Sequence, residues 1–109
     1  MTGPLRYVLV AALFSASAAA GAADMKAGEA KAKEVCQACH GLDGNSPTPE
    51  YPKLGGQLPD YLAKALRDYK SGARKNAIMA GFTGTLSTQD IANLAAYYAA
   101  QPPVLVVKH

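Results

Sequence analysis

The sequence predicts an all-α domain of about four short helices joined by loops. Apolar residues recur at helical spacing in separate segments, and no alternating apolar and polar run indicates a sheet. Between the first two helical segments lies a stretch dense in glycine and proline, which is typical of irregular structure. With 109 residues and two cysteines, one small domain is the expected organisation.

The first 23 residues have the pattern of a cleaved secretory signal peptide. Arg6 closes a short basic region, 7–14 is apolar, and 18–23 is rich in alanine. An uncleaved membrane anchor is the alternative, but the uncharged run from Tyr7 to Ala23 has 17 residues and is diluted by serine and glycine. We therefore expect export to the periplasm, without stable membrane insertion, of a domain over 24–103 with an apolar tail over 104–109.

The first helix is predicted over 25–38, where alanines alternate with lysines and glutamates to give one polar face. Gly28 lies inside this segment and indicates either a frayed start or the close approach of another helix. From Gly41 to Pro59 the chain has four glycines and four prolines, so a loop is expected. A loop this long in a small domain needs something to order it. Its apolar residues could cover a bound group or the core: Leu42, Tyr51, Leu54 and Leu58.

A second helix is predicted from an N-cap at Asp60 to about Lys70, and Ser71 and Gly72 end it. Its apolar residues occur at helical spacing, and we interpret them as core: Tyr61, Leu62, Ala65, Leu66 and Tyr69. Residues 73–86 show no clear period.

The last helix is the best defined from sequence. Ser87 followed by Asp90 resembles a capping box. An apolar face follows at Ile91, Leu94, Ala95 and Tyr98, and Gln101-Pro102-Pro103 ends the helix.

The candidate cofactor-binding residues cluster in Cys36-Gln37-Ala38-Cys39-His40, which has the C-x-x-C-H spacing of c-type haem attachment. On a helix, residues three apart share a face, so Cys36 and Cys39 could each form a thioether to one haem vinyl group. His40 follows at once and is placed to be an axial ligand of the iron. A bound haem would also stabilise a chain whose apolar inventory is small.

Three other interpretations of the cysteine pair remain open. A thioredoxin-like dithiol normally comes with strands, which this sequence lacks. A zinc site would have only His109, the last residue, to add to the motif. A short disulfide is the third alternative.

A haem held by His40 needs a sixth ligand or an open position. Met79 is the methionine placed to supply it, because Met1 lies in the leader and Met25 begins the haem-bearing helix. A thioether is a soft, neutral ligand that raises the reduction potential. The alternative is that Met79 only fills a gap in the core.

The charge balance is mildly basic after the leader, with ten Lys and Arg against eight Asp and Glu from Asp24 onward. Several cations could guide a partner with an acidic face or simply be solvated: Lys53, Lys64, Lys70, Arg74 and Lys75. The sequence has no dense basic run with interleaved aromatics, so we expect no nucleic-acid partner.

Several strings together resemble class I c-type cytochromes of bacteria, in particular small one-haem periplasmic carriers and single domains of the di-haem cytochromes. They are the residues of 36–41, 43–47, 51–57, 78–81, 86–87 and 95–98. The resemblance implies that Cys36 and Cys39 bind the haem, that His40 and Met79 are the iron ligands, and that the carbonyl of Pro52 orients the His40 imidazole. It also implies that helices cross at Gly28 and Tyr97.

On this basis we expect a periplasmic one-electron carrier with one covalent haem c per chain. We expect it to be monomeric, to work with redox proteins as donor and acceptor, and not to be an enzyme. A haem-bearing subunit of a larger oxidoreductase is the main alternative. A haem peroxidase or gas sensor, in which Met79 does not bind the iron, is the other.

Overall fold

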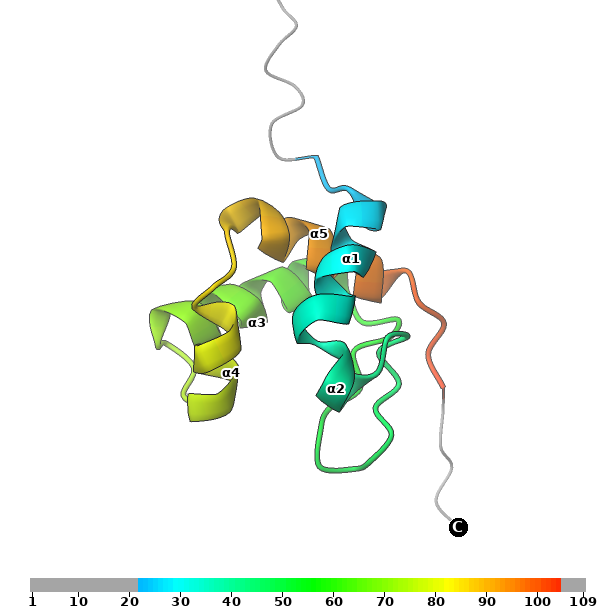
Figure 1. Cartoon of the computed structure of the whole chain (residues 1–109), viewed down its shortest axis with the longest axis horizontal. Coiled ribbons are helices and arrows are strands. Elements are labelled where there is room, and N and C mark those ends of the chain that lie inside the picture. The colour runs from blue at the N-terminus through cyan, green and yellow to red at the C-terminus, as the bar shows by residue number, and fades with distance from the viewer. Residues whose placement is uncertain (1–21, 105–109) are drawn as a thin grey trace, which may run out of the picture.

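The computed structural model describes residues 22–104, which form five helices and no strand (Figure 1). The helices are α1 (Met25–Val35), α2 (Gln37–His40), α3 (Pro59–Ser71), α4 (Ala77–Thr83) and α5 (Thr88–Ala99). The all-α prediction is therefore confirmed. The predicted leader, 1–23, and the apolar tail, 104–109, lie almost entirely outside the described residues.

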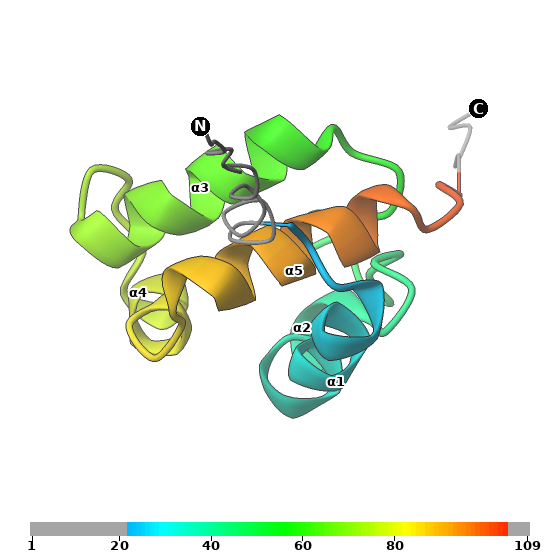
Figure 2. The same ribbon diagram turned by 90° about the horizontal axis from the view of Figure 1, so that it is seen from above.

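Helix α1 packs against α5, and Figure 2 shows the two helices from above. They come close together at Gly28. A Cβ atom added to Gly28 would lie 2.2 Å from the carbonyl oxygen of Asn93 and 2.9 Å from Cβ of Tyr97. The Asn93 side chain accepts a hydrogen bond of 2.8 Å from the backbone N–H of Asp24, the N-cap of α1. The close-approach interpretation of Gly28 is confirmed, and so is its pairing with Tyr97.

The hydrophobic core is built largely on α5. The buried apolar residues come from α1, α3, the segment before α5 and α5 itself: Ala32, Leu62, Leu86, Ile91, Leu94, Ala95, Tyr97 and Tyr98. Leu94 is 1% exposed and is one of the largest fully buried side chains. The predicted apolar face of the last helix is thus confirmed.

The long loop after α2 is tied to α5 by two tyrosines. The Tyr97 hydroxyl donates to the carbonyl of Leu42 at 2.8 Å, and the Tyr98 hydroxyl donates to that of Gly41 at 3.2 Å. Gly44 lies so close to Gly55 that an added Cβ would be 2.6 Å from its backbone nitrogen. The loop is therefore ordered by α5 and by its own folding back.

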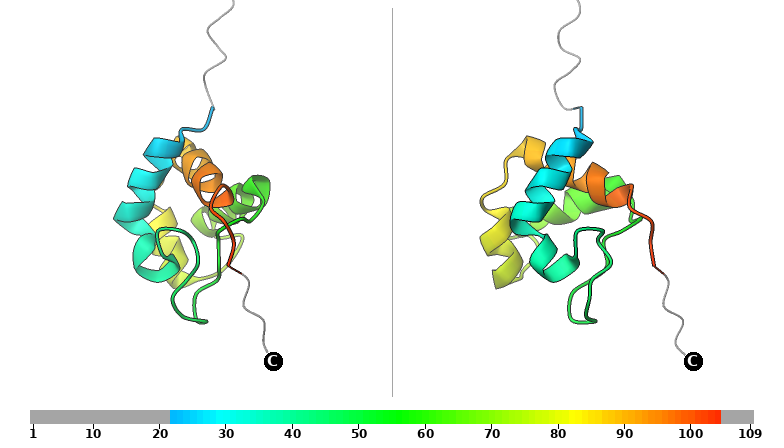
Figure 3. Two further views of the ribbon diagram at one scale, coloured as in Figure 1. Left: turned by 90° about the vertical axis from the view of Figure 1, so that its right-hand side faces the viewer. Right: turned by 45° about the vertical axis from the view of Figure 1, so that its right-hand side comes forward.

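The segment after α5 also holds the loop, and the two lie side by side in Figure 3. The Asn45 side chain donates to the carbonyl of Pro102 at 3.0 Å and accepts from the N–H of Val104 at 2.8 Å. Asn45 itself is oriented by Asp43, whose carboxylate accepts the Asn45 backbone N–H at 2.9 Å.

Three element boundaries differ from prediction. Helix α3 is capped at Leu58 and has Pro59 in its first turn, so the prediction of Asp60 as N-cap was wrong; proline suits this position because its missing N–H would be unpaired anyway. The predicted helix 25–38 is interrupted by a turn at Cys36. Helix α4 was not predicted, although Asn76 caps it by accepting the N–H groups of Ile78 and Met79.

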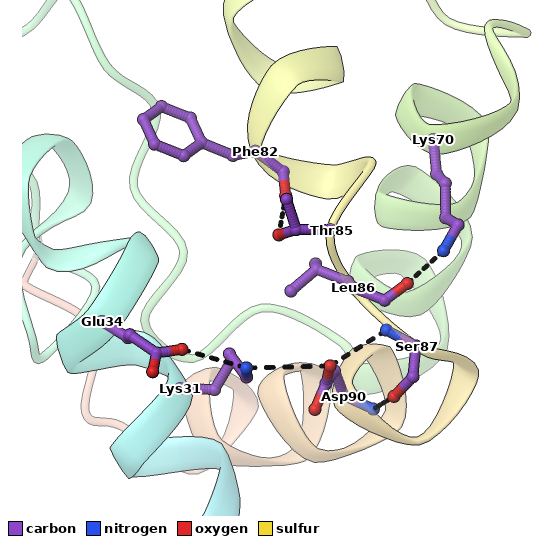
Figure 4. A network of polar contacts seen from close by, with 8 residues as sticks. All are labelled: Lys31, Glu34, Lys70, Phe82, Thr85, Leu86, Ser87 and Asp90. Atoms are coloured by element: carbon purple, nitrogen blue, oxygen red, sulfur yellow. Dashed lines mark hydrogen bonds and ion pairs between the residues drawn. The ribbon is translucent and has the colours of Figure 1, made fainter.

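The start of α5 confirms the capping box and joins it to α1. The Ser87 hydroxyl accepts the Asp90 N–H, and the Asp90 carboxylate accepts the Ser87 N–H, both at 2.9 Å. Asp90 also lies 3.9 Å from the Lys31 ammonium of α1, which pairs with Glu34 at 3.0 Å (Figure 4). In the same view Lys70 of α3 donates to the Leu86 carbonyl just before α5.

Candidate haem-binding site

A cavity of about 360 Å³ opens among α2, α3, α4, α5 and the loop 50–57. This volume falls within the usual range for small-molecule and cofactor sites. Its apolar walls come mainly from α3 and from the core face of α5: Leu62, Ala65, Leu66, Leu94 and Ala95. The site can therefore exclude water from a flat, largely apolar ligand.

One wall carries the C-x-x-C-H motif. Cys36 lies at the turn between α1 and α2, and Cys39 and His40 belong to α2. His40 is 7% exposed, and its Nδ1 lies 2.9 Å from the carbonyl oxygen of Pro52. Because a carbonyl only accepts, Nδ1 carries the proton and Nε2 keeps its lone pair for a metal. Tyr51 packs edge-on against the imidazole, with 6.2 Å between ring centroids.

The two cysteines are unpaired in the structure. Burial raises the pKa of the Cys36 thiol to about 11, against a smaller lowering by the neighbouring Tyr98 hydroxyl. The thiol is therefore protonated at neutral pH, which is the opposite of the low pKa that makes a redox-active dithiol reactive. Within residues 22–104 no group of three or more His, Cys, Asp and Glu side chains is placed to hold a metal ion.

Met79 reaches the same cavity from α4. Its backbone N–H is accepted by Asn76 at 3.0 Å, and its carbonyl accepts the hydroxyl of Thr83 at 2.7 Å. Thr83 is 1% exposed, so this end of α4 is anchored in the interior. Met25, by contrast, is 44% exposed at the start of α1 and does not line the cavity.

The apolar stripe of α3 faces this cavity, so its interpretation as ordinary core was incomplete. Leu62 and Leu66 contribute to both core and cavity, and the other members of the stripe line the cavity: Tyr61, Ala65 and Tyr69. Of the loop residues, Tyr51 and Leu54 also line it. Leu42 packs against the core instead, and Leu58 is 68% exposed.

Some lining residues were missed as site residues from sequence, namely Thr83, Leu86, Leu94, Ala95 and Tyr98. Those of α5 share one helical face, which serves both core and cavity. The period that predicts the face cannot separate these two roles.

The residues present fit a haem c. The cavity combines apolar walls with two thiols that could bond to haem vinyl groups, and with one imidazole nitrogen and one thioether sulfur that are suitable ligands of the iron.

The chain is similar to known c-type cytochromes. Residues 23–97 match the family model described as Cytochrome C oxidase, cbb3-type, subunit III. Cytochrome c4 of Pseudomonas aeruginosa is 54% identical over 80 residues, which are 73% of this chain and 39% of that protein. Cytochrome c-554(548) of Halomonas halodenitrificans is 45% identical over 83 residues, which are 73% of this chain and 99% of that protein.

The crystal structure of reduced recombinant cytochrome c4 from Pseudomonas stutzeri superposes with a TM-score of 0.72 at 43% identity. The match covers 77% of this chain and 48% of that one. The chain thus spans less than half the length of these cytochrome c4 relatives. It belongs to the c-type cytochrome family, with the fold of class I cytochromes, and its family binds haem c covalently.

None of the helices in the described part of the chain is both long and apolar enough to span a bilayer.

Proposed function

We propose that this chain is a periplasmic one-electron carrier that holds a single haem c. The observation that carries the proposal is the convergence of Cys36, Cys39, His40 and Met79 on one apolar cavity. When bound, the haem would supply an Fe(II)/Fe(III) couple. The protein's own residues would attach the haem, bind its iron and hold these ligands in place.

Cys36 and Cys39 would supply the sulfurs of the two thioether bonds. His40 would bind the iron through Nε2, and Pro52 would hold the imidazole in that orientation through the 2.9 Å contact at Nδ1. Met79 would supply the second iron ligand, with Asn76 and Thr83 fixing the turn of α4 that carries it. Ligands fixed in this way change little between the two iron states, which favours rapid transfer.

Docking of partners is proposed at the open side of the cavity. Ile78 and Phe82 of α4 line the cavity yet are 62% and 44% exposed. Such a small apolar area suits the weak, transient contacts of redox proteins, and the mild basic balance can steer an acidic partner. We propose that the chain works as a monomer in this role, is exported by residues 1–23, and catalyses no reaction of its own.

A fixed role in a larger oxidoreductase is the second candidate, and in that case the exposed residues of α4 would be covered by the rest of the complex. Size-exclusion chromatography of the native extract separates the two. A carrier elutes at the size of the free chain, whereas a subunit co-elutes with its complex.

The sixth-ligand assignment is tested by Met79→Ala, with Met25→Ala as the matched control. Loss of the thioether should leave haem attached, lower the reduction potential and admit an external ligand such as carbon monoxide. Met25→Ala should change neither property, because Met25 lies outside the cavity. An unchanged potential in Met79→Ala would refute the assignment and reopen the sensor and peroxidase alternatives.

A further inference from the structure

Haem carries two propionate groups, so a chain that buries it must also accommodate carboxylates. A carboxylate that leaves water beside apolar walls needs hydrogen-bond donors or a cation. Among the described residues that line the cavity, the lysines and arginines are Lys53 and Arg74. These two side chains differ in how they are held.

Lys53 lies in the loop, and its ammonium is 3.4 Å from the carbonyl oxygen of Val104. It is an exposed side chain on a flexible stem. Its hydrogen-bond partner thus belongs to the segment after α5 and is not among the residues that line the cavity.

Arg74 is held at the cavity by aromatic side chains of α3. Its Nη1 donates to the Tyr61 hydroxyl at 3.4 Å, and its guanidinium carbon lies 4.8 Å from the centre of the Tyr69 ring. Gly72, with φ of 89°, ends α3 and turns the chain, and the Arg74 N–H then donates to the carbonyl of Asp68 at 3.0 Å. The turn therefore folds Arg74 back towards the helix that forms the cavity wall.

This arrangement leaves most of the guanidinium donors free. A guanidinium has five N–H groups in one plane, and the Tyr61 hydroxyl uses one of them. Within residues 22–104, no carboxylate lies at ion-pair distance from Arg74, in contrast to Lys31, Lys33 and Lys64. A planar fork oriented on an aromatic ring suits a single carboxylate held by two parallel hydrogen bonds.

We propose that Arg74, oriented by Tyr61 and Tyr69, binds a propionate carboxylate of the haem. The inference rests on the proposed haem site and adds a positioning residue to it. The bound carboxylate stays ionised across neutral pH because the guanidinium favours its charged form. Arg74 thereby keeps the reduction potential independent of pH in the range in which the carrier works.

The test is the reduction potential of the haem-bearing protein from pH 5 to pH 8 in Arg74→Gln and Lys75→Gln. Lys75 is the neighbouring exposed cation and does not line the cavity, so its removal changes the net charge equally. We expect Arg74→Gln to raise the propionate pKa by about one unit or more. Its potential should then fall with rising pH, by up to tenfold in the Fe(II)/Fe(III) equilibrium per pH unit, about 59 mV. Lys75→Gln should keep the flat profile of the wild type.

Other titratable side chains face the cavity and stay unchanged in both variants, so their effects cancel in the comparison. Besides the haem-binding Cys36, Cys39 and His40, they are Glu50, Tyr51 and Lys53 of the loop, Tyr61 and Tyr69 of α3, and Tyr98 of α5.

Two further variants separate charge from geometry. Arg74→Lys keeps the charge without the fork and should give a smaller change in the same direction. Tyr61→Phe removes the hydroxyl that orients the Arg74 guanidinium, and it should also make the reduction potential depend on pH, but less than Arg74→Gln does. Both are conservative changes at exposed positions, so they report on the site even if Arg74→Gln does not fold.

A reduction potential that does not change with pH in Arg74→Gln would overturn this inference and leave the haem assignment standing. An equal pH dependence of the potential in Arg74→Gln and Lys75→Gln would do the same. A wild-type protein without covalent haem would overturn both.

Discussion

Replacing Gly28 by alanine should destabilise the protein by about 1–2 kcal/mol. The new Cβ would meet the Asn93 carbonyl oxygen at 2.2 Å and its carbonyl carbon at 2.8 Å, where ordinary contact begins at 3.4 Å. Backbone atoms cannot rotate away, so α1 and α5 must separate. Overpacking of this kind costs about 1–3 kcal/mol. The gain in helix propensity offsets about 0.5–1 kcal/mol of that cost.

The assay is denaturant or thermal unfolding of the haem-bearing protein, followed by far-UV circular dichroism. For a domain of this size, 1 kcal/mol corresponds to roughly 4–8 °C in Tm. Gly81→Ala is the matched control, because Gly81 lies within α4 and an added Cβ would meet nothing within 4 Å. It should gain about 0.5–1 kcal/mol from propensity alone. If both variants were stabilised equally, the close crossing of α1 and α5 would be wrong.

Three further predictions concern α5 and its caps. Ser87→Ala removes the acceptor for the Asp90 N–H and should cost about 1 kcal/mol in chemical denaturation, whereas an unchanged midpoint would mean that the capping box contributes nothing. The Ser87 N–H lowers the pKa of Asp90, so its contribution is present above the unfolded pKa of about 4 and is lost as pH falls through the folded pKa. Asp90→Asn should thus lose less stability than the wild type between pH 6 and pH 3, and equal losses would contradict this. Tyr97→Phe removes the 2.8 Å bond to the Leu42 carbonyl and should cost about 1 kcal/mol in the same assay, and a fully stable variant would count against the anchoring of the loop by α5.

The sequence allowed the prediction of those features that are encoded locally. The capping box at Ser87 and Asp90, the αL end of α3 at Gly72 and the loop from Gly41 depend on residues a few positions apart. The helix crossing at Gly28 was predicted as one of two alternatives. A glycine inside a helix indicates that another helix can approach closely, but it does not show which one. The resemblance supplied that partner as Tyr97.

The features that were missed depend on contacts between distant residues or on weak local signals. Helix α4 has only seven residues, and its apolar residues Ile78 and Phe82 are exposed. The segment therefore lacks the amphipathic periodicity from which a helix is predicted. The Asn76 cap was the available signal. The turn at Cys36 has no local signal that we can identify.

The division of apolar residues between core and cavity could not be read from their period either. Leu42 and Leu66 both pack against the core, yet of the two only Leu66 also lines the cavity. Only the packing of α3 against α4 and α5 around the cavity decides this.

The most direct test of the account is the visible absorption spectrum, oxidised and reduced, of the protein exported in cells that attach haem. Sharp reduced bands of a low-spin c-type haem, with a weak sulfur-to-iron band when oxidised, are the predicted result for His40 and Met79 as ligands. A high-spin haem that binds carbon monoxide would contradict the role of Met79. A folded but colourless protein would contradict haem attachment at Cys36 and Cys39.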